Sequence, residues 1–194
     1  MHQNPSEETM RRSITLVPLI ALVLAFGLLA QGCTAYKAAV DERSVGGMVD
    51  DEWITAQIEA KFLDDKTVKY LDFDSASYQG HVFITGEYES KAQVDRAVAI
   101  ARGVEGVRRV TTVVFPKREG DTCGTLDNMD IYRQIKQKHI GDEDIHSTNV
   151  DIEVVQCHII MMGIVGSQKE IDDAVAHAKT IPEARSVRNY LRVR

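Results

Sequence analysis

The chain has 194 residues with a formal net charge of −6, and 44% of its residues are hydrophobic. This length suits one large domain or two small ones. The acidic balance excludes a general nucleic-acid binder, because no basic domain is available to neutralise phosphates.

The N-terminus has the layout of a secretory signal peptide. Arg11 and Arg12 precede an uncharged apolar run, residues 14–30, which Pro18 and Gly27 interrupt. A positive end, a short apolar core and small residues before the cut are typical of such signals. A permanent membrane span needs about 20 continuous apolar residues, more than this interrupted run offers. An uncleaved anchor helix is the alternative interpretation.

The end of the apolar run, residues 29–33, resembles a lipobox. In signals of that kind the cysteine receives a diacylglycerol thioether, the signal is removed, and the new N-terminus is acylated. We therefore expect residues 1–32 to be a signal peptide and Cys33 to carry acyl chains such as palmitate, which anchor a protein stably when two or more are present. Thr34 stands where an aspartate indicates inner-membrane retention in enterobacteria. We therefore expect the protein to be anchored in the outer membrane and to face the periplasm.

Two breaks divide the rest of the chain. Residues 33–49 are polar and contain Gly46 and Gly47, which predicts a lipidated tether. Proline and glycines around residues 117–126 predict an interdomain linker. The predicted domains are therefore residues 50–116 and 127–194.

These two domains are copies of each other. When the chain is shifted by about 77 residues it aligns with itself without a gap, which is the signature of a repeat. The matching pairs include Ile54 with Ile131, Lys61 with Lys138, Asp74 with Asp151, His81 with His158, Gly86 with Gly163, and Ser90 with Ser167.

The residue pattern predicts the same order of helices and strands in each copy. In the first copy, Ile54, Ile58 and Phe62 have helical spacing, with Asp50 or Asp51 as the N-cap. Residues 72–78 and 81–85 predict the two strands of a hairpin, with the turn at residues 79–80. Ser90 caps a second helix over 91–102, and a third strand follows over 109–115.

The fold class is therefore α+β: two tandem α-β-β-α-β sandwiches, each with helices on a small, mostly antiparallel sheet. A copy of about 65 residues is only marginally stable alone, so packing the copies together would help both. Gly86 and Gly163 end the second strand of each copy. We predict that both are structurally required, because a side chain there would meet a positive φ or a neighbouring backbone.

The remaining cysteines and the histidines suggest structural roles. With Cys33 lipidated, Cys123 and Cys157 are an even pair in an oxidising compartment, where a disulfide can form. Two unpaired thiols are the alternative, and spacing does not decide between them. No histidine pair has the spacing of a zinc site, so we expect no metal and no cofactor. Nucleophile-elbow, P-loop and dinucleotide motifs are absent, so we expect no enzyme.

These features resemble the BON domain family of bacterial periplasmic and outer-membrane proteins. The resemblance lies in the hairpin segment 78–86, the alanine-rich helix after it and the phrase at residues 104–110, and it extends to both copies. With the lipobox, the chain resembles dual-BON outer-membrane lipoproteins associated with division and envelope stress. The resemblance implies a BON-like fold without catalytic activity, and one domain that binds anionic phospholipid.

The resemblance also implies which copy binds lipid. In that group the lipid-binding domain begins its first helix with Trp-Ile-Thr, and here this phrase is at residues 53–55 of the first copy. The implied lipid-binding residues are Trp53, Lys61, Phe62 and Leu63. Indole prefers the membrane interface. The alternative is that Trp53 packs on its own sheet.

We therefore expect a lipid-anchored envelope protein that binds phospholipid membrane surfaces and supports outer-membrane integrity. The alternative function is a structural module that docks on an envelope protein partner and contacts the membrane only through its acyl chains. The sequence indicates neither the lipid species nor an oligomeric state.

Overall fold

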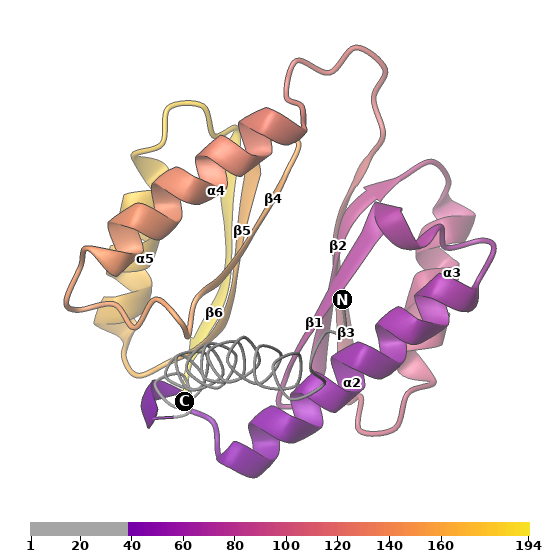
Figure 1. Ribbon diagram of the computed structural model, residues 1–194, viewed down its shortest axis with the longest axis horizontal. Helices are drawn as coiled ribbons and strands as arrows, with labels where there is room; N and C mark the ends of the chain where they lie inside the picture. The colour runs from indigo at the N-terminus through magenta and orange to yellow at the C-terminus, as the bar shows by residue number, and fades with distance from the viewer. Residues whose placement is uncertain (1–38) are drawn as a thin grey trace, which may run out of the picture. The chain divides into compact units, whose positions relative to one another are not determined.

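The computed structural model describes residues 39–194. The predicted signal peptide and Cys33 lie outside the described residues. Asp41–Arg194 forms one compact unit, in which Figure 1 shows two copies of the same motif, each with helices on one side of a small sheet. No helix within residues 39–194 combines the length and apolar character needed to cross a bilayer.

The order of elements confirms the predicted α-β-β-α-β fold in both copies. Repeat 1, residues 45–116, contains α2 (Val45–Asp64), the 3₁₀ helix η1 (Tyr70–Asp72), β1 (Phe73–Tyr78), β2 (His81–Tyr88), α3 (Lys91–Arg102) and β3 (Arg109–Pro116). Repeat 2, residues 125–193, contains α4 (Thr125–Ile140), β4 (Asp151–Val155), β5 (His158–Val165), α5 (Gln168–Lys179) and β6 (Ser186–Val193).

Each sheet has three strands in the order of the chain. The hairpin strands β1 and β2 pair antiparallel, but β2 and β3 pair parallel. Repeat 2 has the same arrangement in β4, β5 and β6. The expectation of a mostly antiparallel sheet was wrong, because the crossover through α3 or α5 returns the chain in its original direction.

The first helix begins earlier than predicted. Its N-cap is Ser44, whose hydroxyl accepts a hydrogen bond from the backbone N–H of Gly47 at 3.1 Å, so neither Asp50 nor Asp51 caps it. The last residues of the predicted tether, 45–49, are therefore helical. Asp51 is instead buried on the inner side of the helix, where it holds the β1–β2 turn.

Each repeat has its own core between its helices and one face of its sheet. In repeat 1 this core includes Ile54, Ile58 and Phe62 of α2, Val82 and Ile84 of β2, and Ala97 and Ala101 of α3. In repeat 2 it includes Ile131 and Ile135 of α4, Ile159 and Met161 of β5, and Ala174 and Ala178 of α5.

The other faces of the two sheets pack against each other. The shared core between them contains Tyr78, Phe83, Val113 and Phe115 from repeat 1 and Val155, Ile160, Met162 and Ile164 from repeat 2. The Phe83 and Tyr190 ring centroids are 5.3 Å apart, and the Phe115 ring stacks on His158. Figure 1 shows the result, with the helices on the outer sides of the sheets. All three cores lie after residue 41, so a chain that starts at Thr34 retains them.

The contact between the two sheets has acidic side chains beside β1 and β4. The Tyr78 hydroxyl donates a hydrogen bond to the Asp151 carboxylate at 2.5 Å. Burial, together with the carboxylates of Asp74 and Asp151, raises the pKa of Glu153 to about 7. A cation also lies at this contact, where the Arg188 guanidinium is 5.0 Å from the centroid of the Phe115 ring.

Gly86 and Gly163 occupy matching places where a strand passes close to a neighbouring backbone. Their φ angles are +128° and +142°, which side chains rarely adopt. A Cβ atom would lie 2.1 Å from the carbonyl oxygen of Asp72 at Gly86, and 2.1 Å from that of Asn149 at Gly163. Both the backbone angle and the lack of space therefore require glycine.

We predict that Gly86→Ala lowers the free energy of unfolding by about 2 kcal/mol or more, because it adds backbone strain and a backbone clash. Urea unfolding of the chain from Thr34 measures this. Gly46→Ala is the control, since a Cβ there meets no atom within 4 Å and the residue lies in α2. Equal stability of Gly86→Ala and the parent chain would refute the requirement.

Candidate functional site

The residues predicted to bind lipid divide into surface and core positions. The side chain of Trp53 is 64% exposed and that of Leu63 is 70% exposed, and Lys61 is exposed as well. Trp53 therefore does not pack on its own sheet. Phe62, however, is fully buried in the core of repeat 1 and has no surface to offer a lipid. The assignment of Phe62 is corrected: it follows the buried spacing of Ile54 and Ile58.

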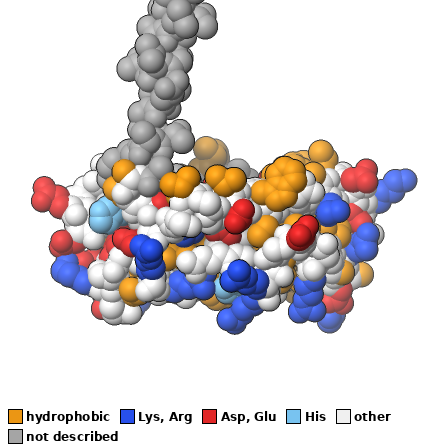
Figure 2. Space-filling view, turned by 90° about the horizontal axis from the view of Figure 1, so that it is seen from below, with side chains coloured by type: hydrophobic (Ala, Val, Ile, Leu, Met, Phe, Trp, Pro, Cys, Tyr) orange, Lys and Arg blue, Asp and Glu red, His pale blue; other side chains and the backbone are white. Residues whose placement is uncertain are grey.

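Helix α2 has a second apolar face, opposite its buried one. We call this face the α2 stripe; its exposed residues are Val45, Val49, Trp53, Ala56, Ala60 and Leu63. They are spaced three or four residues apart, which keeps them on one side of a helix. In the view of Figure 2, hydrophobic side chains gather along the upper edge, with few acidic ones among them.

Helix α4 provides an internal comparison. Leu126 and Ile140 match the outer positions Val49 and Leu63 and are also exposed. The positions that match Trp53, Ala56 and Ala60 hold Asp130, Arg133 and Gln137. Asp130 and Arg133 form an ion pair at 2.6 Å in the middle of the helix. Helix α2 of repeat 1 therefore has a continuous apolar stripe, and helix α4 of repeat 2 does not.

Acidic side chains border the α2 stripe. Asp50, Glu52, Glu59 and Asp64 lie on the same helix, whereas Lys61 is its only cation. Burial, with Asp74 beside it, raises the pKa of Glu59. The stripe is therefore suited to apolar contact, and its borders do not attract anions.

Asp51 fixes the β1–β2 turn to the inner side of α2. Its carboxylate accepts hydrogen bonds from the backbone N–H groups of Gln79 at 2.7 Å and Gly80 at 2.9 Å, and from the Ser77 hydroxyl at 2.9 Å. Both turn residues have positive φ. The Arg43 guanidinium lies 3.0 Å from Asp51 and compensates its buried charge.

The turn and the loop before β3 form a groove beside Trp53. The groove has a volume of about 630 Å³, and its lining includes Trp53, Asp50, Gly80, Glu105, Gly106 and Arg108. A Cβ at Gly80 would lie 2.5 Å from the carbonyl oxygen of Gly106. The absence of a side chain at Gly80 thus lets the turn and the loop touch, and both segments line the groove.

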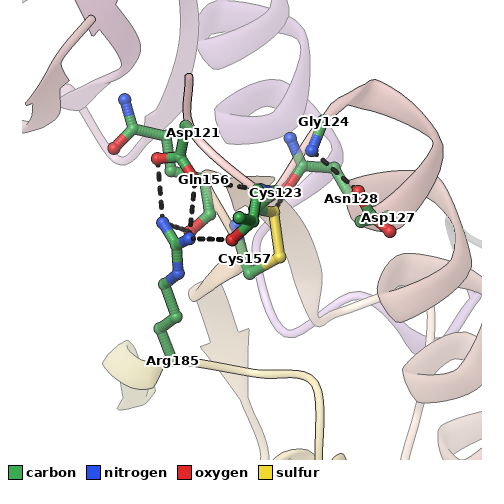
Figure 3. Close-up of a disulfide and its surroundings, with 9 residues drawn as sticks. Asp121, Cys123, Gly124, Asp127, Asn128, Gln156, Cys157 and Arg185 are labelled. Atoms are coloured by element: carbon green, nitrogen blue, oxygen red, sulfur yellow. Dashed lines mark hydrogen bonds and ion pairs between the residues drawn. A yellow bond between two sulfur atoms is a disulfide. The ribbon is translucent and has the colours of Figure 1, made fainter. Parts of the chain in front are cut away.

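In repeat 2 the residues that match Asp51 and Arg108 are paired within the chain. Asn128, which matches Asp51, accepts a hydrogen bond from the Cys157 N–H at 2.9 Å. Arg185, which matches Arg108, is held by both carboxylate oxygens of Asp121, at 2.6 and 2.9 Å. Figure 3 shows Asp121 and Arg185 facing each other beside Cys123 and Cys157. Within residues 39–194, no hydrogen bond or ion pair of this kind holds the Arg108 side chain.

The model of the BON domain matches residues 50–114 and 127–194, which correspond to the two repeats and together cover most of the chain. The chain belongs to the BON domain family. The predicted resemblance is confirmed, and the two BON domains coincide with the two sheets and their helices.

Three relatives show how far the likeness extends. The chain is 32% identical to osmotically-inducible protein Y of Escherichia coli over 152 residues, 77% of this chain and 76% of that protein. It is 26% identical to the outer membrane lipoprotein DolP of Haemophilus influenzae over 90% of this chain and 96% of that one. It is 39% identical to the 21 kDa hemolysin of Actinobacillus pleuropneumoniae over 70 residues, 36% of each chain.

The linker between the BON domains is covalently bound to the second one. Cys123 and Cys157 form a disulfide, which resolves the alternative that the sequence left open. The Arg185 guanidinium also holds the pKa of Asp121 well below its usual range. The Gln156 side-chain amide donates to the Pro116 carbonyl oxygen at 2.8 Å, so the turn of the second domain contacts the end of the first.

Two histidines of repeat 2 have structural partners. His139 is fully buried, with Nε2 at 3.2 Å from the Ala174 carbonyl oxygen, and His177 lies 2.7 Å from the Asp142 carboxylate. In the part of the chain that the structure describes, no three His, Cys, Asp or Glu side chains are grouped to hold a metal ion.

We predict that replacing Cys123 and Cys157 together by serine lowers the free energy of unfolding by about 3–4 kcal/mol, because the bridge closes a loop with a sequence separation of 34. The chain from Thr34 avoids the thiol of Cys33, and urea unfolding measures the change. Thiol titration of the denatured, unreduced parent should find no free thiol. Two reactive thiols per chain would contradict the bridge.

Proposed function

We propose that this protein is a lipid-anchored envelope protein whose first BON domain binds phospholipid membrane surfaces through the α2 stripe. It acts as a membrane-binding module that supports outer-membrane integrity, and it is not an enzyme. The observation that carries the proposal is the α2 stripe itself: Trp53 and Leu63 are 64% and 70% exposed on a helix whose opposite face is already buried.

The anchoring part of the proposal rests on the lipobox and on one relative. DolP of Haemophilus influenzae is named an outer membrane lipoprotein, and the likeness covers 90% of this chain. We propose the same attachment here, with acylated Cys33 in the outer membrane and the BON domains facing the periplasm. Several acyl chains would hold the protein near the bilayer, so the α2 stripe needs only modest affinity of its own.

The energetics favour apolar insertion over charge attraction. Removing one large apolar side chain from water is worth about 1.5–3 kcal/mol, and the interface is the preferred place for indole. Lys61 adds about 1 kcal/mol near an anionic headgroup. The acidic residues beside the stripe oppose a strongly anionic surface, so binding to anionic phospholipid has to come mainly from Trp53, Leu63 and the valines before them.

The second candidate is a protein-docking role. An apolar helix face with acidic borders also fits a groove on an envelope protein partner whose rim is basic. In that case the chain would contact the membrane only through its acyl chains. Vesicle binding by the unlipidated chain distinguishes the two candidates.

We predict that the chain from Thr34 floats with vesicles of mixed phosphatidylethanolamine and phosphatidylglycerol, and that Trp53→Ala lowers the affinity about tenfold or more. Leu63→Glu should abolish flotation, because it places a charge in the stripe. Ile140→Glu on α4 is the matched control, since Ile140 is 72% exposed at the corresponding position of repeat 2. Absence of flotation for the parent chain would favour the protein-docking candidate.

We predict that Cys33→Ser yields an unprocessed precursor that incorporates no labelled palmitate. The control is Cys123→Ser together with Cys157→Ser, which leaves Cys33 intact and should be labelled like the parent. Palmitate incorporation into Cys33→Ser would show that the lipid anchor lies elsewhere.

A further inference from the structure

The groove beside Trp53 carries charges of both signs. Arg108 lies on the β3 side, and Asp50 on α2 and Glu105 on the loop supply two carboxylates. The third carboxylate in the lining, Asp51, is buried and already paired with Arg43 and the turn N–H groups. The charges left for a ligand are therefore one guanidinium and two carboxylates. A purely anionic ligand meets repulsion here, whereas a ligand with an anion and a cation finds a partner for each.

Repeat 2 shows what an arginine at this place binds. Arg185 matches Arg108, and the backbone N–H of each donates to the matching turn residue at 2.8 Å, Cys157 for Arg185 and Gly80 for Arg108. The Arg185 guanidinium holds both oxygens of the Asp121 carboxylate. Residue 44, which matches Asp121 in repeat 1, is Ser44, and its hydroxyl caps α2 instead. Repeat 1 thus keeps the arginine but lacks the internal oxyanion.

We propose that this groove binds the phosphoethanolamine headgroup of a phospholipid, with the phosphate at Arg108 and the primary ammonium at Glu105 and Asp50. A phosphodiester offers the two oxygens that a guanidinium prefers, as the Asp121 carboxylate does at Arg185. An ammonium group donates hydrogen bonds to carboxylates, which a quaternary choline cannot do. The inference rests on the proposed function, since it names the headgroup that lies beside the inserted α2 stripe.

The position of Trp53 links the groove to the membrane surface. Trp53 belongs to the α2 stripe and also lines the groove, so an indole at the interface brings the groove to the level of the headgroups. A volume of about 630 Å³ is within the range of small-molecule sites. The acidic borders of α2 then contribute to selectivity, because they disfavour headgroups that carry no cation.

The test compares vesicles of phosphatidylcholine alone with vesicles that also contain phosphatidylethanolamine or phosphatidylglycerol, using the chain from Thr34. We expect phosphatidylethanolamine to strengthen binding and Arg108→Gln to weaken it about fivefold on either mixture, as expected for one basic contact near a headgroup. Glu105→Gln combined with Asp50→Asn should weaken binding only where phosphatidylethanolamine is present, and should strengthen it on phosphatidylglycerol.

Two controls separate the groove from general effects. Arg109→Gln removes a neighbouring exposed charge that does not line the groove, and it should bind like the parent. Phosphatidylethanolamine also loosens bilayer packing, which would help Trp53 insert into the membrane. That effect would persist in the Glu105 and Asp50 double variant, whereas the headgroup contact would not.

The outcomes distinguish this inference from the proposed function. If Trp53→Ala loses binding while Arg108→Gln and the double variant bind like the parent, the headgroup site is overturned and the α2 stripe stands. If the parent binds no vesicle, the proposed function fails. In that case soluble phosphoethanolamine is added to the chain, and the amide signals of Gly80 and Gly106 are monitored by NMR. A shift of these signals would show that the groove binds the free zwitterion instead. If the chain binds no vesicle and these signals do not shift, the groove binds neither the lipid headgroup nor free phosphoethanolamine, and the proposed site is overturned.

Discussion

Each sheet has apolar side chains on both faces but helices on only one, so the second face has to be covered by something else. The middle strands make this plain: residues 159–165 of β5 are all buried, and β2 is buried from residue 82 to 85. A middle strand paired on both sides and buried on both faces has such a continuous apolar run. The repeats cover each other's sheets, which explains why a unit with about 65 residues per copy forms a stable body. It also leaves the helices, the strand edges and the loops to contact other molecules.

The two repeats hold the hairpin turn and the arginine beside it with different residues. Asp51 holds its turn with a charge that Arg43 compensates, whereas the neutral Asn128 needs no cation. Arg185 is saturated by Asp121, and a disulfide closes the linker over the turn. The matching place in repeat 1, beside the β1–β2 turn, is a groove that Arg108 and Trp53 line. The matching arginine is therefore paired within the chain in repeat 2, whereas Arg108 of repeat 1 lines a groove without such a partner within residues 39–194.

Much of the fold follows from the sequence, because the repeat gives every element two independent signals. The buried spacing of Ile54 and Ile58 is matched by Ile131 and Ile135. The start of α2 was missed since Gly46 and Gly47 have low helix propensity, and the Ser44 cap and the Arg43 ion pairs outweigh that tendency. Phe62 was assigned to the surface from a family phrase although its spacing placed it in the core. The groove was missed because its residues come from three separate segments; the comparison of Arg108 with Arg185 was the signal that could have found it.

In the proposed function the membrane-binding surface has acidic borders, which suits a protein that acyl chains already hold at the membrane. An anchored domain meets the bilayer at a high effective concentration, so its own contact can be weak and still be occupied. Under that condition, attraction between a basic domain and anionic lipid would add little selectivity, because it acts on any anionic surface within a Debye length. Repulsion at Glu52, Glu59 and Asp64 would add selectivity, since it would confine binding to the proposed orientation in which Trp53 and Leu63 enter the interface. In the proposed function, the acidic character that excludes a nucleic-acid binder would thus help to define how the first BON domain meets a lipid surface.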